Sequence, residues 1–150
     1  MRNRRYLEIA LERELFRLSR YGRPVSLIVL DLDDFKRIND TYGHDTGDRV
    51  LKGVARLLEE HLRLSDRAVR LGGEEFALLL PETPLNRARA AAERIQKALR
   101  GLQIPPVERI SASFGVVQAL STDSPLSLLK RADAAMYTAK RRGKNRVEIG

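Results

Sequence analysis

A run of mainly apolar residues from Val25 to Leu30, which ends at Asp31, limits the possible folds of this chain more than any other feature. The run does not show the alternation of apolar and polar residues that is typical of a half-exposed strand. It therefore predicts a strand that is covered on both faces, with other elements packed on either side of its sheet. The carboxylate of Asp31 is expected at the point where this buried strand ends.

The rest of the chain shows helical and strand patterns in alternation. Leucines recur at helical spacing from Leu7 to Leu18 and stop before Gly22, a residue type that often ends a helix. The other expected helices run from Val50 to Leu62 after an Asp45 or Thr46 cap, from Pro84 to Gly101 after a Thr83 cap, and from Ser124 and Pro125 toward Gly143. The other expected strands run from Ala68 to Leu71, from Phe76 to Leu80, from Ile110 to Val116 as a half-buried strand, and from Asn145 to Ile149. This order predicts an α/β (α+β) domain in which helices pack on a mixed sheet.

Length and composition indicate one domain that stays out of membranes. The chain has 150 residues, 43% of them hydrophobic, and no segment approaches the roughly 18 consecutive apolar residues of a membrane span. The first residues are too highly charged for a signal peptide, so we expect a cytoplasmic protein without membrane insertion. The absence of cysteine excludes disulfides and thiolate metal sites.

The net charge of +8 favours anionic partners such as phosphates, nucleic acid or an acidic membrane surface. Acidic residues nevertheless gather in the segment 31–48 and at Glu74 and Glu75. An acidic pocket on a basic protein indicates a phosphate ligand that is bound through a metal ion. Nucleic-acid binding ranks last among the functions considered, because no aromatic stacking platform accompanies the basic residues.

The stretch RLGGEEFALLLP, residues 70–81, combines two glycines with two adjacent glutamates. Its simplest interpretation is a hairpin in which Glu74 and Glu75 are solvated turn residues. If this hairpin pairs beside the strand that ends at Asp31, three carboxylates would repel one another unless a cation held them. Oxygen ligands of this kind select magnesium or manganese and imply a nucleoside triphosphate as the ligand. The alternative is that Asp31, Asp33 and Asp34 only cap the following helical turn.

Three segments together resemble the GGDEF family of diguanylate cyclases, with GGEEF as the form of its signature. They are DLDDFKRINDTYGHDTGD from Asp31, RLGGEEF from Arg70, and RADAAMYTAKRRGKNRV up to Val147. The resemblance implies a fold related to class III nucleotide cyclases and polymerase palms, with a central, mainly antiparallel five-stranded mixed sheet flanked by helices. It also implies the condensation of two GTP molecules into cyclic di-GMP with release of two pyrophosphates, and inhibition by the product.

The resemblance assigns the metal and catalytic roles residue by residue. Asp31, the backbone carbonyl of Leu32, Glu74 and Glu75 match the ligands of two Mg²⁺ or Mn²⁺ ions per active site. Two metals would lower the pKa of the ribose 3′-hydroxyl that attacks the second GTP. Glu74 and Lys36 are the expected catalytic residues, the first as proton acceptor and the second as stabiliser of the leaving pyrophosphate.

Further positions match the substrate-binding residues of the family. They are Asn39 and Asp48 for guanine, Gly72 and Gly73 for the turn beside the substrate, and Lys140 and Lys144 for phosphate oxygens. An aspartate can accept from the N1–H and the exocyclic amine of guanine, a donor pair that adenine lacks, which favours GTP over ATP. Without the resemblance, the two lysines would be interpreted as favourable charges at a helix C-terminus.

The segment RLSD, from Arg63 to Asp66, matches the family's inhibitory product site, and Arg94 matches its secondary arginine. An arginine can bind guanine O6 and N7 in a bidentate manner, while an aspartate accepts from the opposite edge. An R-x-x-D pattern by itself usually means no more than a surface ion pair.

We expect residues 1–150 to form a single GGDEF catalytic domain, without the family's usual sensory domain or its first N-terminal residues. One chain has one GGEEF turn and would hold one GTP, so the resemblance implies that catalysis requires a homodimer. The alternative function is a receptor module that binds GTP or cyclic di-GMP without turnover. The intact Asp31, Lys36, Glu74 and Glu75 favour the enzyme.

Overall fold

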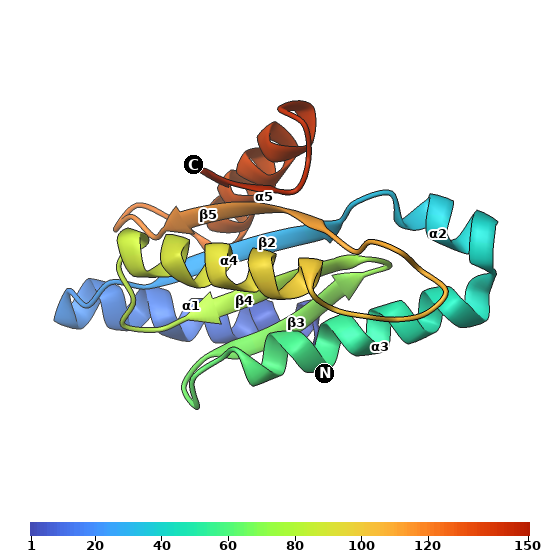
Figure 1. Cartoon of the computed structure of the whole chain (residues 1–150). Coiled ribbons are helices and arrows are strands. Elements are labelled where there is room, and N and C mark those ends of the chain that lie inside the picture. The colour runs from blue at the N-terminus through green and yellow to red at the C-terminus, as the bar shows by residue number, and fades with distance from the viewer.

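A six-stranded sheet forms the centre of the computed structural model, which describes all 150 residues of the chain (Figure 1). The strands are β1 (Arg2–Asn3), β2 (Ser26–Leu32), β3 (Arg67–Gly72), β4 (Glu75–Leu80), β5 (Ala112–Gln118) and β6 (Arg146–Ile149). The helices are α1 (Arg4–Tyr21), α2 (Phe35–Tyr42), α3 (His44–Glu60), α4 (Leu85–Arg100) and α5 (Pro125–Arg141). No helix combines the length and apolar character that crossing a lipid bilayer requires.

The strands lie in the order β1-β3-β4-β2-β5-β6. Strand β2 is central and antiparallel to both β4 and β5, whereas the outer pairs β1–β3 and β5–β6 are parallel. The predicted mixed, mainly antiparallel sheet is confirmed, but it has six strands instead of five. The additional strand is β1, which pairs Arg2 and Asn3 with Val69 and Arg70 and is too short to produce a periodic pattern.

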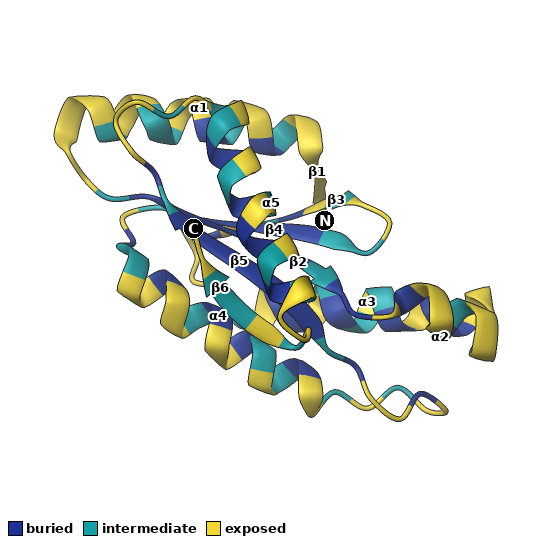
Figure 2. Cartoon of the chain, turned by 90° about the horizontal axis from the view of Figure 1, so that it is seen from above, coloured by how far each residue is buried: buried dark blue, intermediate teal, exposed yellow.

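Helices cover both faces of the sheet, as the apolar run of β2 predicts (Figure 2). Successive side chains of a strand point to opposite faces. Ile28 and Leu30 accordingly belong to a core under α2, α3 and α4, whereas Leu27 and Val29 belong to a second core under α1 and α5. All four side chains are fully buried, which fixes the path of β2 through the middle of the domain.

Strand β5 differs from the prediction, because it is buried on both faces instead of one. Helix α4 covers one face and α5 packs tightly on the other. A Cβ atom at Gly115 would lie 2.1 Å from the carbonyl oxygen of Ala132 in α5. The small residues that alternate with apolar ones along β5 therefore allow a close approach of α5 and do not mark a solvent-exposed face.

The helix boundaries agree with the prediction more closely at some ends than at others. Helix α1 ends at Gly22 in the left-handed conformation, and Ser124 caps α5 with a capping box, both as predicted. The predicted caps of α3 and α4 are wrong. Helix α3 begins after Gly43, before Asp45 and Thr46, and α4 begins after Pro84. The Thr83 hydroxyl instead donates to the Pro81 carbonyl and accepts from Arg63.

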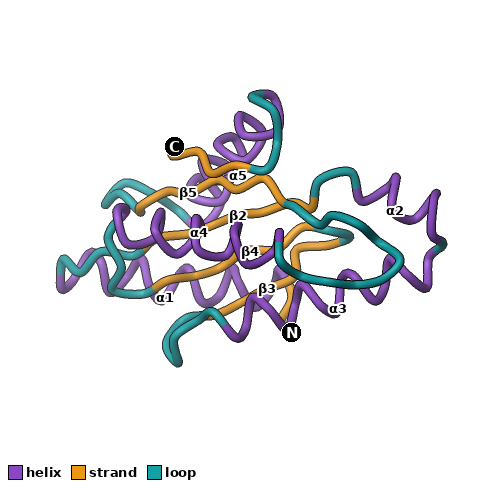
Figure 3. Tube along the Cα trace, viewed as in Figure 1, coloured by secondary structure: helices purple, strands orange, loops and turns teal.

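Helix α2 and the start of α3 lie beyond the end of the sheet where the C-terminal end of β2 lies (Figure 1). The loop between α4 and β5 extends toward the same region (Figure 3). It is attached there by a 2.9 Å hydrogen bond from Arg49 of α3 to the carbonyl of Pro105. The end of β2 is therefore surrounded by elements from separate parts of the chain.

Candidate functional site

The carboxylates of the predicted site meet where β2 ends. Asp31 and Glu75 are direct cross-strand partners, and the Leu32 amide donates to the Glu74 carbonyl at 3.2 Å. The hairpin of the simplest interpretation is therefore present, and it brings both glutamates beside Asp31. Gly72 and Gly73 adopt positive φ values of 151° and 49°, which side chains with a Cβ rarely allow.

These carboxylates influence one another electrostatically. Burial raises the pKa of Asp31, as do the charges of Glu74 and Asp33, while Lys140 opposes the shift. Burial also raises the pKa of Glu75, followed by the charges of Asp133 and Asp31. A positive charge placed among these groups would relieve their repulsion.

The donor chemistry fits a hard divalent cation. Asp31, Glu74, Glu75 and the Leu32 carbonyl offer only oxygen donors, which Mg²⁺ and Mn²⁺ prefer. No three acidic or histidine side chains converge closely enough to enclose a metal ion unaided. Mg²⁺ typically takes one or two carboxylates and completes its shell with substrate phosphates and water.

Two lysines from the other end of the chain face this site. The Lys140 ammonium, at the end of α5, lies 3.1 Å from Asp31 Oδ1 and 3.3 Å from Asp33 Oδ1. Lys144, in the turn between α5 and β6, donates to Asp34 Oδ1 at 2.7 Å, which lowers the pKa of that aspartate. A favourable charge at a helix C-terminus does not explain these contacts, because both lysines pair with aspartates from the end of β2.

The interpretation as helix caps holds in position for Asp34 and is wrong for Asp33. Asp34 occupies the cap position of α2 with φ of 53°, but its side chain makes no capping hydrogen bond. Asp33 is buried, and its carboxylate accepts hydrogen bonds from Ser111, Ser113 and Asn145. The available sequence signal was the spacing of Asp33, two residues after Asp31, which places both on the same side of an extended strand.

The predicted guanine-reading residues lie at the corner between α2 and α3. Asn39 is half-buried and its side chain covers Gly47, where a Cβ atom would lie 1.8 Å from Asn39 Oδ1. Asp48 follows Gly47 on α3 and is exposed. Lys36 is exposed on the first turn of α2. The structure thus brings Asn39 and Asp48 close to each other and leaves Lys36 open to solvent.

The residues of the predicted product site lie together near the C-terminal end of α3. Arg63 donates to Asp66 from two guanidinium nitrogens, at 3.3 and 3.1 Å, and also to the Pro81 carbonyl. Arg63, Asp66 and Arg94 line one cavity of about 260 Å³. The ion pair of the simplest interpretation is present; Asp66 is buried at 8% exposure, whereas the Arg63 side chain stays exposed.

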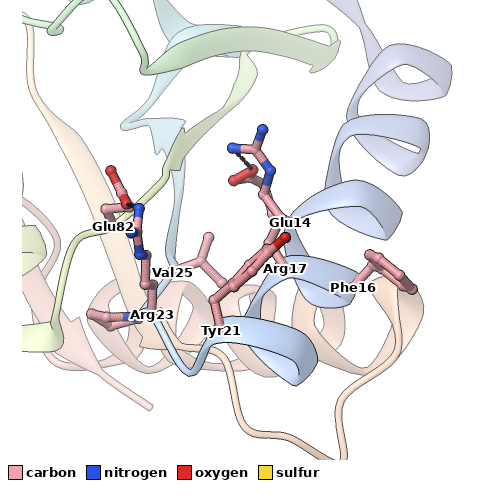
Figure 4. Close-up of a pocket in the computed structure, with 8 residues that line it drawn as sticks. Glu14, Phe16, Arg17, Tyr21, Arg23, Val25 and Glu82 are labelled. Carbon is pink, nitrogen blue, oxygen red and sulfur yellow. Dashed lines mark hydrogen bonds and ion pairs between the residues drawn. The ribbon is translucent and has the colours of Figure 1, made fainter.

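A separate cavity of about 380 Å³ lies at the opposite end of β2, beside the C-terminal end of α1 (Figure 4). Phe16, Tyr21 and Val25 line it together with the ion pair of Arg23 and Glu82. Because Val25 and Asp31 stand at opposite ends of this strand, the cavity is no part of the carboxylate site.

The comparisons with known proteins agree with this arrangement. The sequence profile described as "Diguanylate cyclase, GGDEF domain" matches residues 1–146. The diguanylate cyclase VdcA of Vibrio cholerae is 42% identical over 148 residues, which cover 95% of this chain and 44% of VdcA. The chain thus spans less than half the length of that relative.

Solved structures give the same result. The active GGEEF domain of a diguanylate cyclase from Vibrio cholerae has a TM-score of 0.93 and 35% identity, over 99% of this chain and 96% of that chain. The GGDEF domain of DgcB from Caulobacter crescentus, solved in complex with c-di-GMP, has a TM-score of 0.92 and 34% identity, over 98% of this chain and 87% of that chain. The chain therefore belongs to the GGDEF family of diguanylate cyclase domains.

Proposed function

We propose that this domain, residues 1–150, condenses two GTP molecules into cyclic di-GMP and releases two pyrophosphates. The observation that carries the proposal is the pairing of Asp31 with Glu75 at the end of β2, with Lys140 within 3.1 Å of the same aspartate. This combination supplies oxygen donors for a cation and positive charge for a triphosphate in one place. Family membership supports the same reaction.

Each residue has a defined role in this proposal. Asp31, the Leu32 carbonyl, Glu74 and Glu75 hold two Mg²⁺ or Mn²⁺ ions, which lower the pKa of the ribose 3′-hydroxyl when bound. Glu74 accepts the hydroxyl proton as the oxygen attacks the α-phosphorus of the second GTP. Three lysines contact the triphosphate and stabilise charge on the leaving pyrophosphate. These lysines are Lys36, Lys140 and Lys144.

The reaction requires two chains. Each domain has one GGEEF turn, which begins with Gly72 and Gly73, and holds one GTP. The two bonds of cyclic di-GMP form between nucleotides held by facing domains, so the catalytic unit is a homodimer. The location proposed for the reaction is the cytoplasm, which supplies GTP.

Incubation of the purified chain with GTP and Mg²⁺, followed by mass spectrometry of the products, tests the proposed function. Cyclic di-GMP is expected with GTP, and no cyclic dinucleotide is expected with ATP. Tight GTP binding without any product would instead establish the receptor module.

Gly47→Ala is expected to weaken GTP binding while leaving the fold intact. The new methyl group would displace the Asn39 side chain that covers Gly47, and the loss of a base-reading hydrogen bond should raise the KM for GTP about tenfold. Alanine is a better helix former than glycine by about 1 kcal/mol, so the melting temperature should not fall because of helix propensity.

Gly53→Ala is the matched control for this prediction. It changes a glycine in the same helix, but the added Cβ would meet flexible side-chain ends away from Asn39, Ile104 Cδ1 at 2.9 Å and Leu102 Cδ2 at 3.6 Å. Its KM for GTP should resemble that of the wild type. Equal KM values for Gly47→Ala and the wild type would contradict the assignment of Asn39 to the guanine site.

Arg63→Ala is expected to relieve inhibition by the product. The variant loses a charged bidentate donor, which should weaken cyclic di-GMP binding by roughly 5- to 150-fold in titration calorimetry. The reaction should then proceed to a higher product concentration before it stalls. Arg89→Ala, which removes an exposed arginine of α4 that pairs with Glu93, should bind the product as the wild type does. Equal product affinity in Arg63→Ala and the wild type would leave RLSD as an ion pair alone.

A further inference from the structure

The carboxylate of Asp33 joins four segments of the chain at the edge of the site. Its Oδ1 accepts from Ser113 Oγ at 2.6 Å and lies 3.3 Å from Lys140 Nζ. Its Oδ2 accepts from Ser111 Oγ at 2.7 Å and from the backbone N–H of Asn145 at 2.9 Å. Asp33 is only 6% exposed, so water cannot solvate its carboxylate. These partners supply the hydrogen bonds that water would otherwise provide.

The turn between α5 and β6, residues 143–145, has an unusual backbone. Gly143, Lys144 and Asn145 have consecutive positive φ values of 122°, 64° and 47°. Residues other than glycine adopt this region at an energetic cost, and such a conformation persists only where its surroundings hold it. Two side chains bind the backbone of Asn145 in this turn. Asp33 accepts from its N–H, and Gln96 of α4 donates to its carbonyl at 2.7 Å.

Two lysines lie beside or within the strained turn. Lys140 precedes the turn and points between Asp31 and Asp33, and Lys144 within it reaches the end of β2. We propose that Asp33 is a positioning residue that places Lys140 and Lys144 to receive the triphosphate of GTP. The inference rests on the proposed function, because that function gives these lysines their ligand.

The two oxygens of Asp33 explain why a carboxylate is needed at this position. The backbone N–H of Asn145 donates to Oδ2, whereas the Lys140 ammonium approaches Oδ1. Both partners are obligate donors, so an asparagine amide, with one oxygen and one NH₂ group, can accept from only one of them. Loss of the negative charge would also leave Asp31 as the main ionic partner of Lys140 and draw the ammonium toward the predicted metal ligands.

Asp33→Asn tests the proposal. The expected result is an approximately tenfold weaker affinity for GTP in the presence of Ca²⁺, measured by titration calorimetry, because the charge-assisted contacts of the lysines are misplaced. The kcat/KM for GTP should fall by at least the same factor. Glu148→Gln serves as the matched control, because it removes a carboxylate from β6 that pairs only with Arg142, and it should bind GTP as the wild type does.

A double-mutant cycle separates positioning from a purely structural role. If Asp33 acts through the lysines, Asp33→Asn should weaken GTP binding little further in a chain that already carries Lys140→Met and Lys144→Met. A full additional tenfold loss in that background would overturn the proposal. Gln96→Ala, which releases the same turn without touching Asp33, should also weaken GTP binding and provides a second test if Asp33→Asn folds poorly.

These binding measurements do not depend on turnover. If the wild type binds GTP in an Asp33-dependent manner but forms no cyclic di-GMP, the proposed function fails while the positioning role stands. If the wild type forms cyclic di-GMP and both Asp33→Asn and Gln96→Ala bind GTP with wild-type affinity, the positioning role fails while the proposed function stands.

Discussion

Replacing Asp31 with asparagine or Glu74 with glutamine should reduce the rate of cyclic di-GMP formation by at least about a thousandfold. Each variant removes a charged oxygen donor from the predicted metal ligands, and metal ions stabilise the charge of such transition states by several kcal/mol, at tenfold in rate per 1.4 kcal/mol. Chromatographic quantification of cyclic di-GMP at saturating GTP and Mg²⁺ measures the loss.

Circular dichroism and thermal unfolding check that these variants remain folded. Burial and neighbouring carboxylates already disfavour the ionised form of Asp31, so a neutral amide of the same shape should cost little stability there. Glu93→Gln, a carboxylate-to-amide change on exposed α4, is the matched control and should retain full activity. Turnover near the wild-type level in both Asp31→Asn and Glu74→Gln would contradict the metal assignment.

Dilution should have the second largest effect. If two facing chains are needed for each product molecule and the isolated domain is mainly monomeric at low micromolar concentration, the rate per subunit rises with enzyme concentration. In the dilute limit the rate per subunit is proportional to concentration, so a hundredfold dilution should lower it by up to about a hundredfold. Initial rates over this range, at constant GTP and Mg²⁺, give the dependence.

Sedimentation velocity on the same samples provides the control for the dilution series. A rate per subunit that stays constant while the protein sediments as a monomer throughout would contradict the two-chain mechanism. A constant rate is compatible with that mechanism only where a dimer persists over the whole range.

Much of the fold could be predicted because side-chain periodicity reports which faces of an element are covered. The apolar run from Val25 to Leu30 correctly predicted a central strand with helices on both sides. Strand β1 could not be predicted, because two residues have no period and its pairing with Val69 and Arg70 is a contact between distant segments. The alternation in β5 was misleading, because Ser113 and Gly115 face α5 and Asp33 instead of solvent.

The predicted site was recoverable to the extent that its residues are adjacent in sequence or match a family motif. The hairpin at Gly72 and Gly73 and the strand that ends at Asp31 were visible in the sequence, and the structure pairs them directly. Asp33 was misinterpreted because a run of aspartates before a helix resembles a cap. Its partners Ser111 and Asn145 lie 78 and 112 residues further along the chain, a distance that no local pattern spans.

The central claim is that this domain joins two GTP molecules, and product stoichiometry tests it most directly. Purified chain at a concentration that favours dimers, incubated with GTP and Mg²⁺, should release two pyrophosphates for every cyclic di-GMP formed, as measured by coupled pyrophosphate detection and mass spectrometry. The Glu74→Gln variant, assayed in parallel, should release neither. Wild-type protein that binds GTP but leaves it unchanged, or that releases pyrophosphate without forming cyclic di-GMP, would contradict the claim.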